Sequence, residues 1–220
     1  FMDGAIKSWH DAFGMSNTKR RGPDDELLVL YEQQGTTLYE LNSSASGIGD
    51  VQLTAAMPIR QVAENGYGLT VRTTLKLPTG DEQELRGSGA ADFATGLYVT
   101  NTASLFNRPL DISAFAGAIL LGDGDVLSDI QESTVPFGGI VGSWQATERL
   151  SITTQLQAQG AYFDSEIDEL GGSTIQLGVG FGYRPRGSDR CLMFAVVEDI
   201  QADATTDFAL HFSFGSRCPR

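Results

Sequence analysis

The stretch that decides the fold is residues 174–184, Thr-Ile-Gln-Leu-Gly-Val-Gly-Phe-Gly-Tyr-Arg. Every second residue there is apolar, in the order Ile175, Leu177, Val179, Phe181 and Tyr183. Gln176 and three glycines stand between them. A period of two is typical of a β-strand with one apolar and one polar face. At about ten residues, the segment is longer than the average strand of about 5–6 residues.

The same alternation recurs along most of the chain. It predicts strands at 26–33, 36–43, 49–60, 67–78, 90–101, 109–121, 135–146, 150–163, 174–184, 191–200 and 206–216. No helix-length segment separates these strands, which excludes a parallel fold built from βαβ units. No repeat with a period of about 20–50 residues is present, which argues against a propeller or a solenoid. The sequence therefore predicts an all-β fold in an antiparallel, up-and-down order.

Composition excludes several classes of protein. The 220 residues include 28 Asp and Glu but only 15 Lys and Arg, giving a net charge of −13. A nucleic-acid-binding protein needs a basic face, so we expect no nucleic-acid partner. No apolar run of about 18 residues is present, which excludes a transmembrane helix. A mean hydropathy of −0.12 is ordinary for a soluble protein. It is equally compatible with a transmembrane β-barrel, whose lumen-facing residues are polar.

The connections between the predicted strands separate a membrane barrel from a soluble sandwich or barrel. Alternate connections are acidic, with Asp81, Glu82, Glu84, Asp123, Asp125, Asp129, Glu132, Asp164, Glu166, Asp168, Glu169, Asp199 and Asp203. The intervening connections are shorter and basic, with Arg60, Arg108, Arg149, Arg184, Arg186 and Arg190. Alternate connections of a meander lie at opposite ends of the sheet. Long outer loops and short periplasmic turns are the arrangement of transmembrane barrels.

Residues 1–25 differ from the rest of the chain. Ile6, Trp9, His10 and Phe13 have helical spacing and Gly14 follows them, which predicts a short helix near 3–13. We therefore divide the chain into an outer-loop helix and linker at 1–25 and a β-barrel at 26–220. Trp9, His10 and Phe13 are a possible lid over the barrel mouth.

The number of predicted strands is odd, whereas bacterial single-chain barrels have an even number. One interpretation is that one or more strands precede residue 1 in the full protein. The other is that the weak pair at 26–43 lies partly outside the barrel. Either interpretation gives an antiparallel up-and-down transmembrane β-barrel of about 10–12 strands.

Several short motifs resemble an uncharacterised family of Gram-negative outer-membrane β-barrels known as domain of unknown function 3187. They are Trp9-His10, Phe13-Gly14, Arg20-Arg21, Gly47-Ile-Gly49-Asp50, Leu77-Pro-Thr-Gly-Asp81, Gly87-Ser-Gly89 and Asp92. The resemblance implies an outer-membrane barrel with a short helix in an outer loop. It also implies that strands precede the Trp-His segment. It implies no activity.

Charged residues on the polar phase of neighbouring strands form the best candidate site. Counting from the expected turns sets Lys76 about opposite Asp50, and Asp92 opposite Lys76. Arg72 lies one step deeper on the same phase. The predicted cluster of Asp50, Arg72, Lys76 and Asp92 faces the lumen near the outer end. Such charges can neutralise one another and brace the wall, or form a constriction that selects solutes by charge.

Other chemistry is poorly supported by the sequence. His10 and His211 are the only histidines and have no zinc-site spacing, and the acidic loop 123–132 does not match an EF-hand. No hydrolase, P-loop or dinucleotide motif is present, so we expect no enzyme, no catalytic residues, no metal and no cofactor. Cys191 and Cys218 lie near one end of the last hairpin. A disulfide there would suit an oxidising periplasm, and two free thiols are the alternative.

The favoured interpretation is a barrel in a bacterial outer membrane that serves as a passive channel or transporter for small polar solutes. Its partners would be membrane lipid, lipopolysaccharide and the barrel-insertion machinery. A second interpretation is a closed structural or adhesive surface barrel whose loops bind divalent cations or lipopolysaccharide, since about ten strands leave room for side chains to fill the lumen. A soluble secreted β-sandwich is a third.

Overall fold

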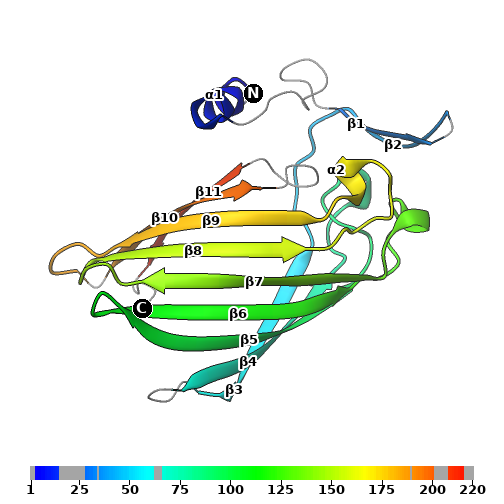
Figure 1. Ribbon diagram of the computed structural model, residues 1–220. Helices are drawn as coiled ribbons and strands as arrows, with labels where there is room; N and C mark the ends of the chain where they lie inside the picture. The colour runs from blue at the N-terminus through cyan, green and yellow to red at the C-terminus, as the bar shows by residue number, and fades with distance from the viewer. Residues whose placement is uncertain are drawn as a thin grey trace.

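The computed structural model describes residues 3–14, 28–33, 35–61, 66–188, 190–200 and 208–215. The protein is mostly antiparallel β-structure, organised as a nine-stranded sheet and a separate two-stranded sheet. Figure 1 shows the large sheet curling, so that β3 passes behind the middle strands. The described sheet is therefore a curved single layer.

The large sheet is a simple meander in the order β11-β10-β9-β8-β7-β6-β5-β4-β3. Its strands are β3 (Val51–Arg60), β4 (Tyr67–Leu77), β5 (Asp92–Leu105), β6 (Arg108–Leu120), β7 (Thr134–Trp144), β8 (Leu150–Gln159), β9 (Thr174–Tyr183), β10 (Cys191–Asp199) and β11 (Phe208–Gly215). The antiparallel, up-and-down order predicted from the alternation is confirmed. Strand bounds agree with the predicted ones to within about four residues, the usual error of a sequence-based boundary.

The hairpin of β1 (Val29–Gln33) and β2 (Thr36–Leu41) does not join the large sheet. The 26–43 pair therefore lies outside the large sheet, as one of the two interpretations expected, but the nine strands that remain are still an odd number. Among the described strands, β1 pairs only with β2. Within the described residues the large sheet is open, and β3 and β11 are its two edges.

Four short helices accompany the strands in the described part of the chain. Helix α1 (Asp3–Phe13) confirms the helix predicted near 3–13. The acidic connections contain η1 (Glu82–Glu84), η2 (Ser128–Ile130) and α2 (Asp168–Gly171), which the sequence analysis did not predict. Among the described residues, no helix is both long enough and apolar enough to cross a membrane.

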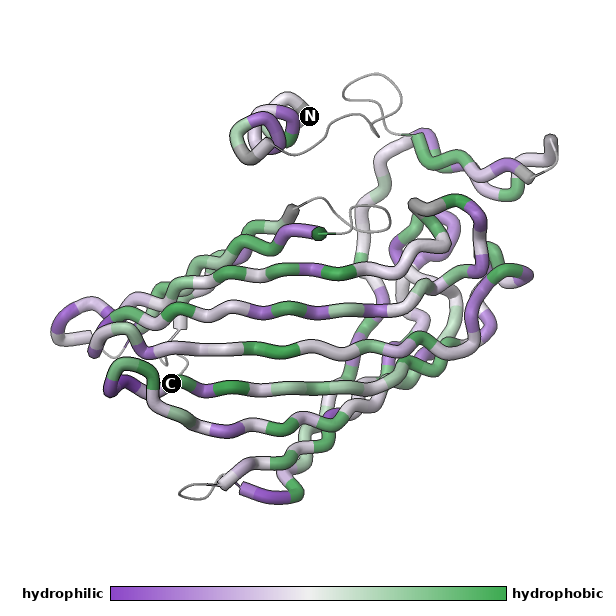
Figure 2. Tube along the Cα trace, in the orientation of Figure 1, coloured by the Kyte–Doolittle hydropathy of each residue, from purple (hydrophilic) through white to green (hydrophobic). Residues whose placement is uncertain are grey.

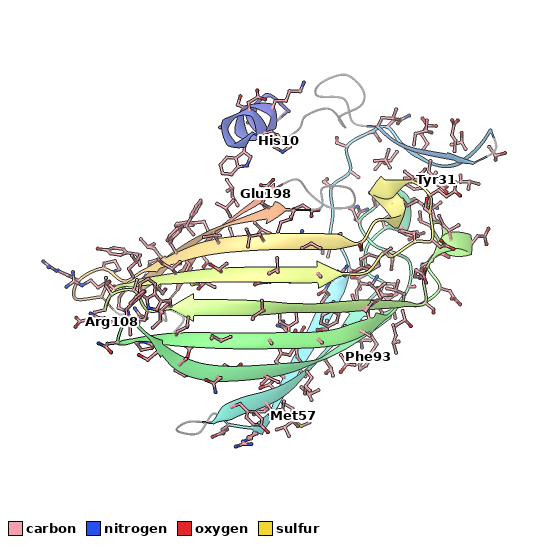
Figure 3. The ribbon with its side chains drawn as sticks, viewed as in Figure 1. His10, Tyr31, Met57, Phe93, Arg108 and Glu198 are labelled. Carbon is pink, nitrogen blue, oxygen red and sulfur yellow. The ribbon has the colours of Figure 1, made fainter. Side chains whose placement is uncertain are left out.

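The two faces of the sheet differ in polarity, as Figure 2 shows along each strand. One face presents large apolar side chains to the exterior, among them Phe93, Leu97, Ile140, Leu177 and Phe212, each at least 36% exposed. Figure 3 shows Met57 and Phe93 projecting away from the sheet on this outer face. The only buried apolar residues of the described part are Ala90, Val135 and Cys191. A sandwich buries its apolar face against a second layer, and the described residues form no such layer.

The inner face carries polar and small side chains, and hydroxyl pairs cross it between neighbouring strands. Thr54 bonds Thr74 at 2.9 Å, Thr100 bonds Ser113 at 2.9 Å, and Ser143 bonds Thr153 at 3.0 Å. Such cross-strand pairs each stabilise a sheet by roughly 0.2–1 kcal/mol. Part of the polar phase of the alternation is thus used for hydrogen bonds between neighbouring strands.

The two ends of the sheet also differ. Tight turns join the strands at one end, where Figure 3 labels Arg108. The β5–β6 turn has Phe106 and Asn107 at φ values of +52° and +60°, as in a two-residue type I′ turn. The exposed Phe106 ring packs edge-on against Trp144 at 5.9 Å between ring centres. The acidic connections with their short helices occupy the opposite end, called the loop end below (Figure 1).

Candidate functional site

An ionic cluster lies where the first strands meet the loop end. The Lys76 ammonium is 2.6 Å from the Asp92 carboxylate and 3.2 Å from the Asp50 carboxylate. It also donates a hydrogen bond to the Ser88 hydroxyl. All three charged side chains are at most 16% exposed. The structure therefore brings together three of the four charged residues that the sequence analysis grouped.

The Asp50 carboxylate is held by backbone donors as well. It accepts hydrogen bonds from the N–H groups of Gly80 at 2.9 Å and Ser88 at 3.1 Å. Burial acts to raise the pKa of this carboxyl, but the two N–H groups and Lys76 outweigh burial, so its pKa lies below the ordinary value. Asp50 is therefore ionised at neutral pH and serves as an anchor for the 78–91 loop.

Asp92 ties in a second loop. Its carboxylate accepts a hydrogen bond from the Gly122 N–H at 3.1 Å. Gln131 then closes that loop on itself, accepting from Gly124 N–H at 3.2 Å and donating to the Gly122 carbonyl at 2.6 Å. The cluster thus links the approach to β3, the β4–β5 loop and the β6–β7 loop.

The strand register differs in one place from the predicted one. Lys76 pairs with Asp92 across β4 and β5 as predicted, but Gln52, not Asp50, stands opposite Lys76 on β3. Asp50 precedes β3 and reaches Lys76 from the approach to the strand. Arg72 is exposed on the same face, opposite Ala56, and is not among the residues that bind Lys76, Asp50 or Asp92 in the contacts described above.

A second cluster, centred on Arg86, was missed by the sequence analysis. Its guanidinium contacts Glu84 at 2.5 Å and Asp81 at 3.4 Å, and donates to the Ile48 carbonyl at 3.3 Å. Gly80 belongs to this arrangement, because a Cβ there would lie 2.1 Å from the Arg86 carbonyl oxygen. The sequence did contain a signal for this cluster, because Arg86 follows Glu84 by two residues and Asp81 by five.

The inner face of β8 to β11 is hollowed into a pocket of about 520 Å³. Its lining combines polar and apolar residues with the glycines of β9. The polar ones are Ser151, Thr153, Gln155, Gln157, Gln176 and His211, and the apolar ones include Met193, Ala195, Val197 and Ala209. Within the described residues that line it there is no Asp, Glu, Lys or Arg. The pocket lies within the usual range of about 300–1,000 Å³ for small-molecule sites.

An aromatic row continues the inner face on the next three strands. Tyr98 on β5 stacks on Phe115 of β6 with 5.1 Å between ring centres, and Phe115 lies 6.3 Å from Phe137 of β7. Glycines make room for these rings, since a Cβ on Gly117 would lie 2.5 Å from the Phe137 ring and one on Gly139 would lie 2.7 Å from the Phe115 ring. Large aromatic side chains therefore cover the glycine positions of neighbouring strands.

A family model described as "Protein of unknown function (DUF3187)" matches residues 1–217. The chain belongs to this family. No curated protein matches it. The DUF3187 motifs from Gly47 to Asp92 meet in the structure, because Gly49, Asp50, Gly80, Asp81 and Gly87–Gly89 all surround the Lys76 and Arg86 clusters. The Arg20-Arg21 motif lies outside the described residues.

The β1–β2 hairpin contacts the loop end in this DUF3187 member. The Tyr39 hydroxyl donates to the Gln83 carbonyl of η1 at 2.8 Å. Burial, with the nearby carboxylates of Asp81 and Glu84, raises the pKa of Tyr39. Tyr31 and Leu38 share a small hollow of about 150 Å³ with residues 127–130. The hairpin thus covers part of the acidic end.

Helix α1 stands apart from the loop end in Figure 1, level with the middle of the strands. His10 is 6% exposed and Trp9 is half-buried. The side chain of Phe13 lies outside the described residues. A lid formed by Trp9, His10 and Phe13 remains a prediction.

The remaining predicted site residues concern cysteines and metals. Cys191 is fully buried and takes part in a disulfide. Cys218, its predicted partner, lies outside the described residues. Over the described part of the chain, no group of three or more His, Cys, Asp or Glu side chains could hold a metal ion.

Proposed function

We propose that the nine-stranded sheet forms most of the wall of a β-barrel in the outer membrane of a Gram-negative bacterium. The lumen of this barrel would be a passive channel for small polar solutes. The observation that carries the proposal is the inversion of the two faces. Large apolar side chains such as Leu97 and Phe212 are exposed on the outside, while the hollowed inside is lined by Gln, Ser and Thr together with glycines and smaller apolar residues. Lipid would cover the outer face, and this would stabilise the protein by about 25 cal/mol for each Å² of apolar area removed from water.

The ends of the sheet support an orientation in the membrane. Acidic loops with short helices gather at one end, and tight, arginine-bearing turns at the other. In outer-membrane barrels the long loops are extracellular and the short turns periplasmic. Aromatic residues near the turn end, Trp144 with the exposed Phe106, then stand where an interfacial girdle is expected.

Closure of the barrel follows from strand direction. The nine strands are joined by antiparallel pairings throughout, so β3 and β11, at opposite edges, run in the same direction. An all-antiparallel barrel therefore needs a further strand between these two edges, which would bring the total to an even number. We include that strand in the proposed barrel.

The contacts of Lys76 bear on whether the channel selects by charge. Two carboxylates neutralise this ammonium, and the backbone N–H groups that hold Asp50 belong to loop residues. We infer that this cluster braces the loop end and joins the loops, rather than forming the charged constriction that the sequence also allowed.

A second candidate function is a closed structural or surface-binding barrel. It is favoured by one observation, the row of Tyr98, Phe115 and Phe137 that fills part of the inner face. Barrels of about eight strands can be filled by their own side chains, whereas 16–18 strands leave a water channel. Conduction separates the two candidates.

The test is reconstitution of the full chain into planar lipid bilayers and vesicles. Far-ultraviolet circular dichroism and resistance to protease establish that the protein has inserted and folded. We expect discrete conductance steps from the folded protein, and none from an equal amount of heat-denatured protein. Folded, protease-resistant protein without any conductance would favour the closed barrel. A protein that stays folded in buffer and never partitions into vesicles would overturn both.

A further inference from the structure

The pocket on β8 to β11 shows the chemistry expected of a site for an uncharged solute. Its polar groups are the amides of Gln155, Gln157 and Gln176 and the hydroxyls of Ser151 and Thr153, with His211 at the edge strand. Among the described lining residues there is no carboxylate, ammonium or guanidinium. An ion that leaves water for such a wall finds no countercharge, so its desolvation is not compensated.

The amides match hydroxyl groups. A glutamine side chain carries two donors and an acceptor, and a hydroxyl group is both donor and acceptor. The Gln155 amide donates to the Gln157 carbonyl oxygen at 2.9 Å, which orients Gln157. Gln157 stands directly opposite Gln176 in the β8–β9 register. Two amides are thus held side by side, at the spacing of neighbouring strands, on the pocket wall.

Most charges on the inner face lie on other strands and are largely engaged. On β10, Asp199 stands opposite Gln176, but it is 5% exposed and does not line the pocket. Lys76 is bound by Asp50 and Asp92, and Asp111 accepts a hydrogen bond from the Thr102 hydroxyl at 2.6 Å. Arg72 is exposed on β4, on the far side of the aromatic row from the pocket in the strand order. Among the described residues, the inner face thus has most of its charges on β4 to β6, whereas the side chains that line the pocket on β8 to β11 are uncharged.

The aromatic row adds an apolar surface next to the amides. Phe137 stands opposite Gln159 across β7 and β8, so the row borders the glutamine wall directly. A molecule with hydroxyl groups at its edges and C–H groups on its faces would contact both surfaces. A purely apolar molecule would contact only the aromatic surface, and a simple ion would be favoured by neither surface.

We propose that this pocket selects neutral polyhydroxylated solutes of about monosaccharide size over charged solutes of equal size, and that Gln157 and Gln176 determine this specificity. The proposal rests on the proposed channel, because it names the class of solute that the channel passes. Selection would arise from hydrogen bonds between the two amides and the solute hydroxyls, without a charged filter.

The experiment is swelling of vesicles that contain the full chain, using glucose, gluconate and glucosamine as probes in high salt. We expect glucose to enter fastest. Gln157→Met removes the amide at nearly constant volume and should lower the glucose-to-gluconate rate ratio by about two- to tenfold, the effect of one lost hydrogen bond. Gln52→Met is the matched control, because Gln52 lies on the inner face of β3 but not in the pocket. It should leave the ratio unchanged.

Equal entry of all three probes, or an equal effect of both variants, would overturn the proposal. Faster entry of gluconate would point to Arg72 and would also overturn it. If no probe enters although the protein is folded, the channel itself fails. The pocket is then tested in micelles by titrating the ¹⁵N-labelled glutamine side-chain amides with glucose and with gluconate. Saturable shifts with glucose alone would retain the site, and their absence would remove it.

Discussion

The two faces of the sheet use the same alternation for opposite purposes. On β9 the outward Leu177, Phe181 and Tyr183 are exposed, whereas Gln176 and Gly178 line a pocket on the inner side. In a water-soluble sheet the apolar face is the buried one. Here the apolar face has no cover among the described residues, and the polar face is the hollowed one. The difference teaches that alternation in the sequence separates the two faces of a strand. Which environment each face meets is indicated only by the curvature of the sheet and the exposure of its side chains.

The largest expected effect comes from placing a charge on the outer face. Val179 lies near the middle of β9, and Val179→Arg would set a charge in the proposed hydrocarbon layer at a cost of about 2–4 kcal/mol. Gly178→Ser is the control on the inner face, where a Cβ meets its nearest atom, Val197 Cγ2, at 3.5 Å. We expect Val179→Arg to block folding into bilayers, measured by protease resistance and urea titration, and Gly178→Ser to fold normally. Equal tolerance at both positions would contradict the assignment of the outer face to lipid.

The next effect concerns the Lys76 cluster. Lys76→Met would leave the carboxylates of Asp50 and Asp92 without their cation, and hydrogen bonds to charged groups contribute about 1.5–3 kcal/mol. The variant should unfold at lower urea concentration at neutral pH. Arg72→Met is the control, because Arg72 is an exposed cation on the same strand and face, and should change the free energy of unfolding by less than about 0.5 kcal/mol.

The same cluster has a pH dependence whose sign follows from Asp50. Its pKa is lowered in the folded protein, so its contribution to stability is fully present above the ordinary carboxyl pKa. That contribution is lost as the pH falls through the lower folded value. The difference in unfolding free energy between the wild type and Lys76→Met should therefore shrink as the pH falls below the ordinary carboxyl pKa. A difference that does not change with pH would show that Lys76 acts by packing alone.

Two glycines on β7 offer a matched test of the inner aromatic row. Gly139→Ala would place a Cβ 2.5 Å from the Leu156 carbonyl oxygen and 2.7 Å from the Phe115 ring, whereas a Cβ on Gly142 meets nothing within 4 Å. Overpacking of this kind costs about 1–3 kcal/mol. Gly142→Ala should be neutral or stabilising by up to about 1 kcal/mol. The free energy of unfolding of both variants is measured by urea titration in the same lipid. If Gly139→Ala leaves it unchanged, the aromatic rings move aside easily and the row is not tightly packed.

Most of the fold was predictable because it depends on short-range patterns. Strong alternation located the strands, and the spacing of Ile6, Trp9 and His10 located α1. The β5–β6 turn was harder to place. In the structure β5 extends to Leu105 and β6 begins at Arg108, which leaves a turn of only two residues. Such a turn requires Phe106 to take a positive φ, which is rare for a bulky residue. Local propensity does not reveal such a turn.

The candidate site was predictable in part, for a related reason. Pairing of Lys76 with Asp92 follows from counting residues around one loop. Asp50 acts from outside β3, and Arg86 gathers Asp81 and Glu84 through the shape of the loop. Loop conformation depends on contacts between distant segments, such as that of Tyr39 with Gln83, which no local pattern encodes. The pocket likewise needs the curvature of several strands.

The smallest expected effect compares two neighbouring threonines of β8. Thr153 faces inward and shares a hydrogen bond with Ser143 at 3.0 Å, while Thr154 faces outward and is exposed. Thr153→Val keeps the shape but removes that bond, at a cost of about 1 kcal/mol. Thr154→Val replaces a hydroxyl by a methyl group on the face assigned to lipid, so it should be neutral or slightly stabilising in a bilayer. Because the two substitutions are chemically identical, a difference in sign between them isolates the environment of each face. Equal costs at both positions would mean that both faces meet water, and the proposed membrane wall would then be wrong.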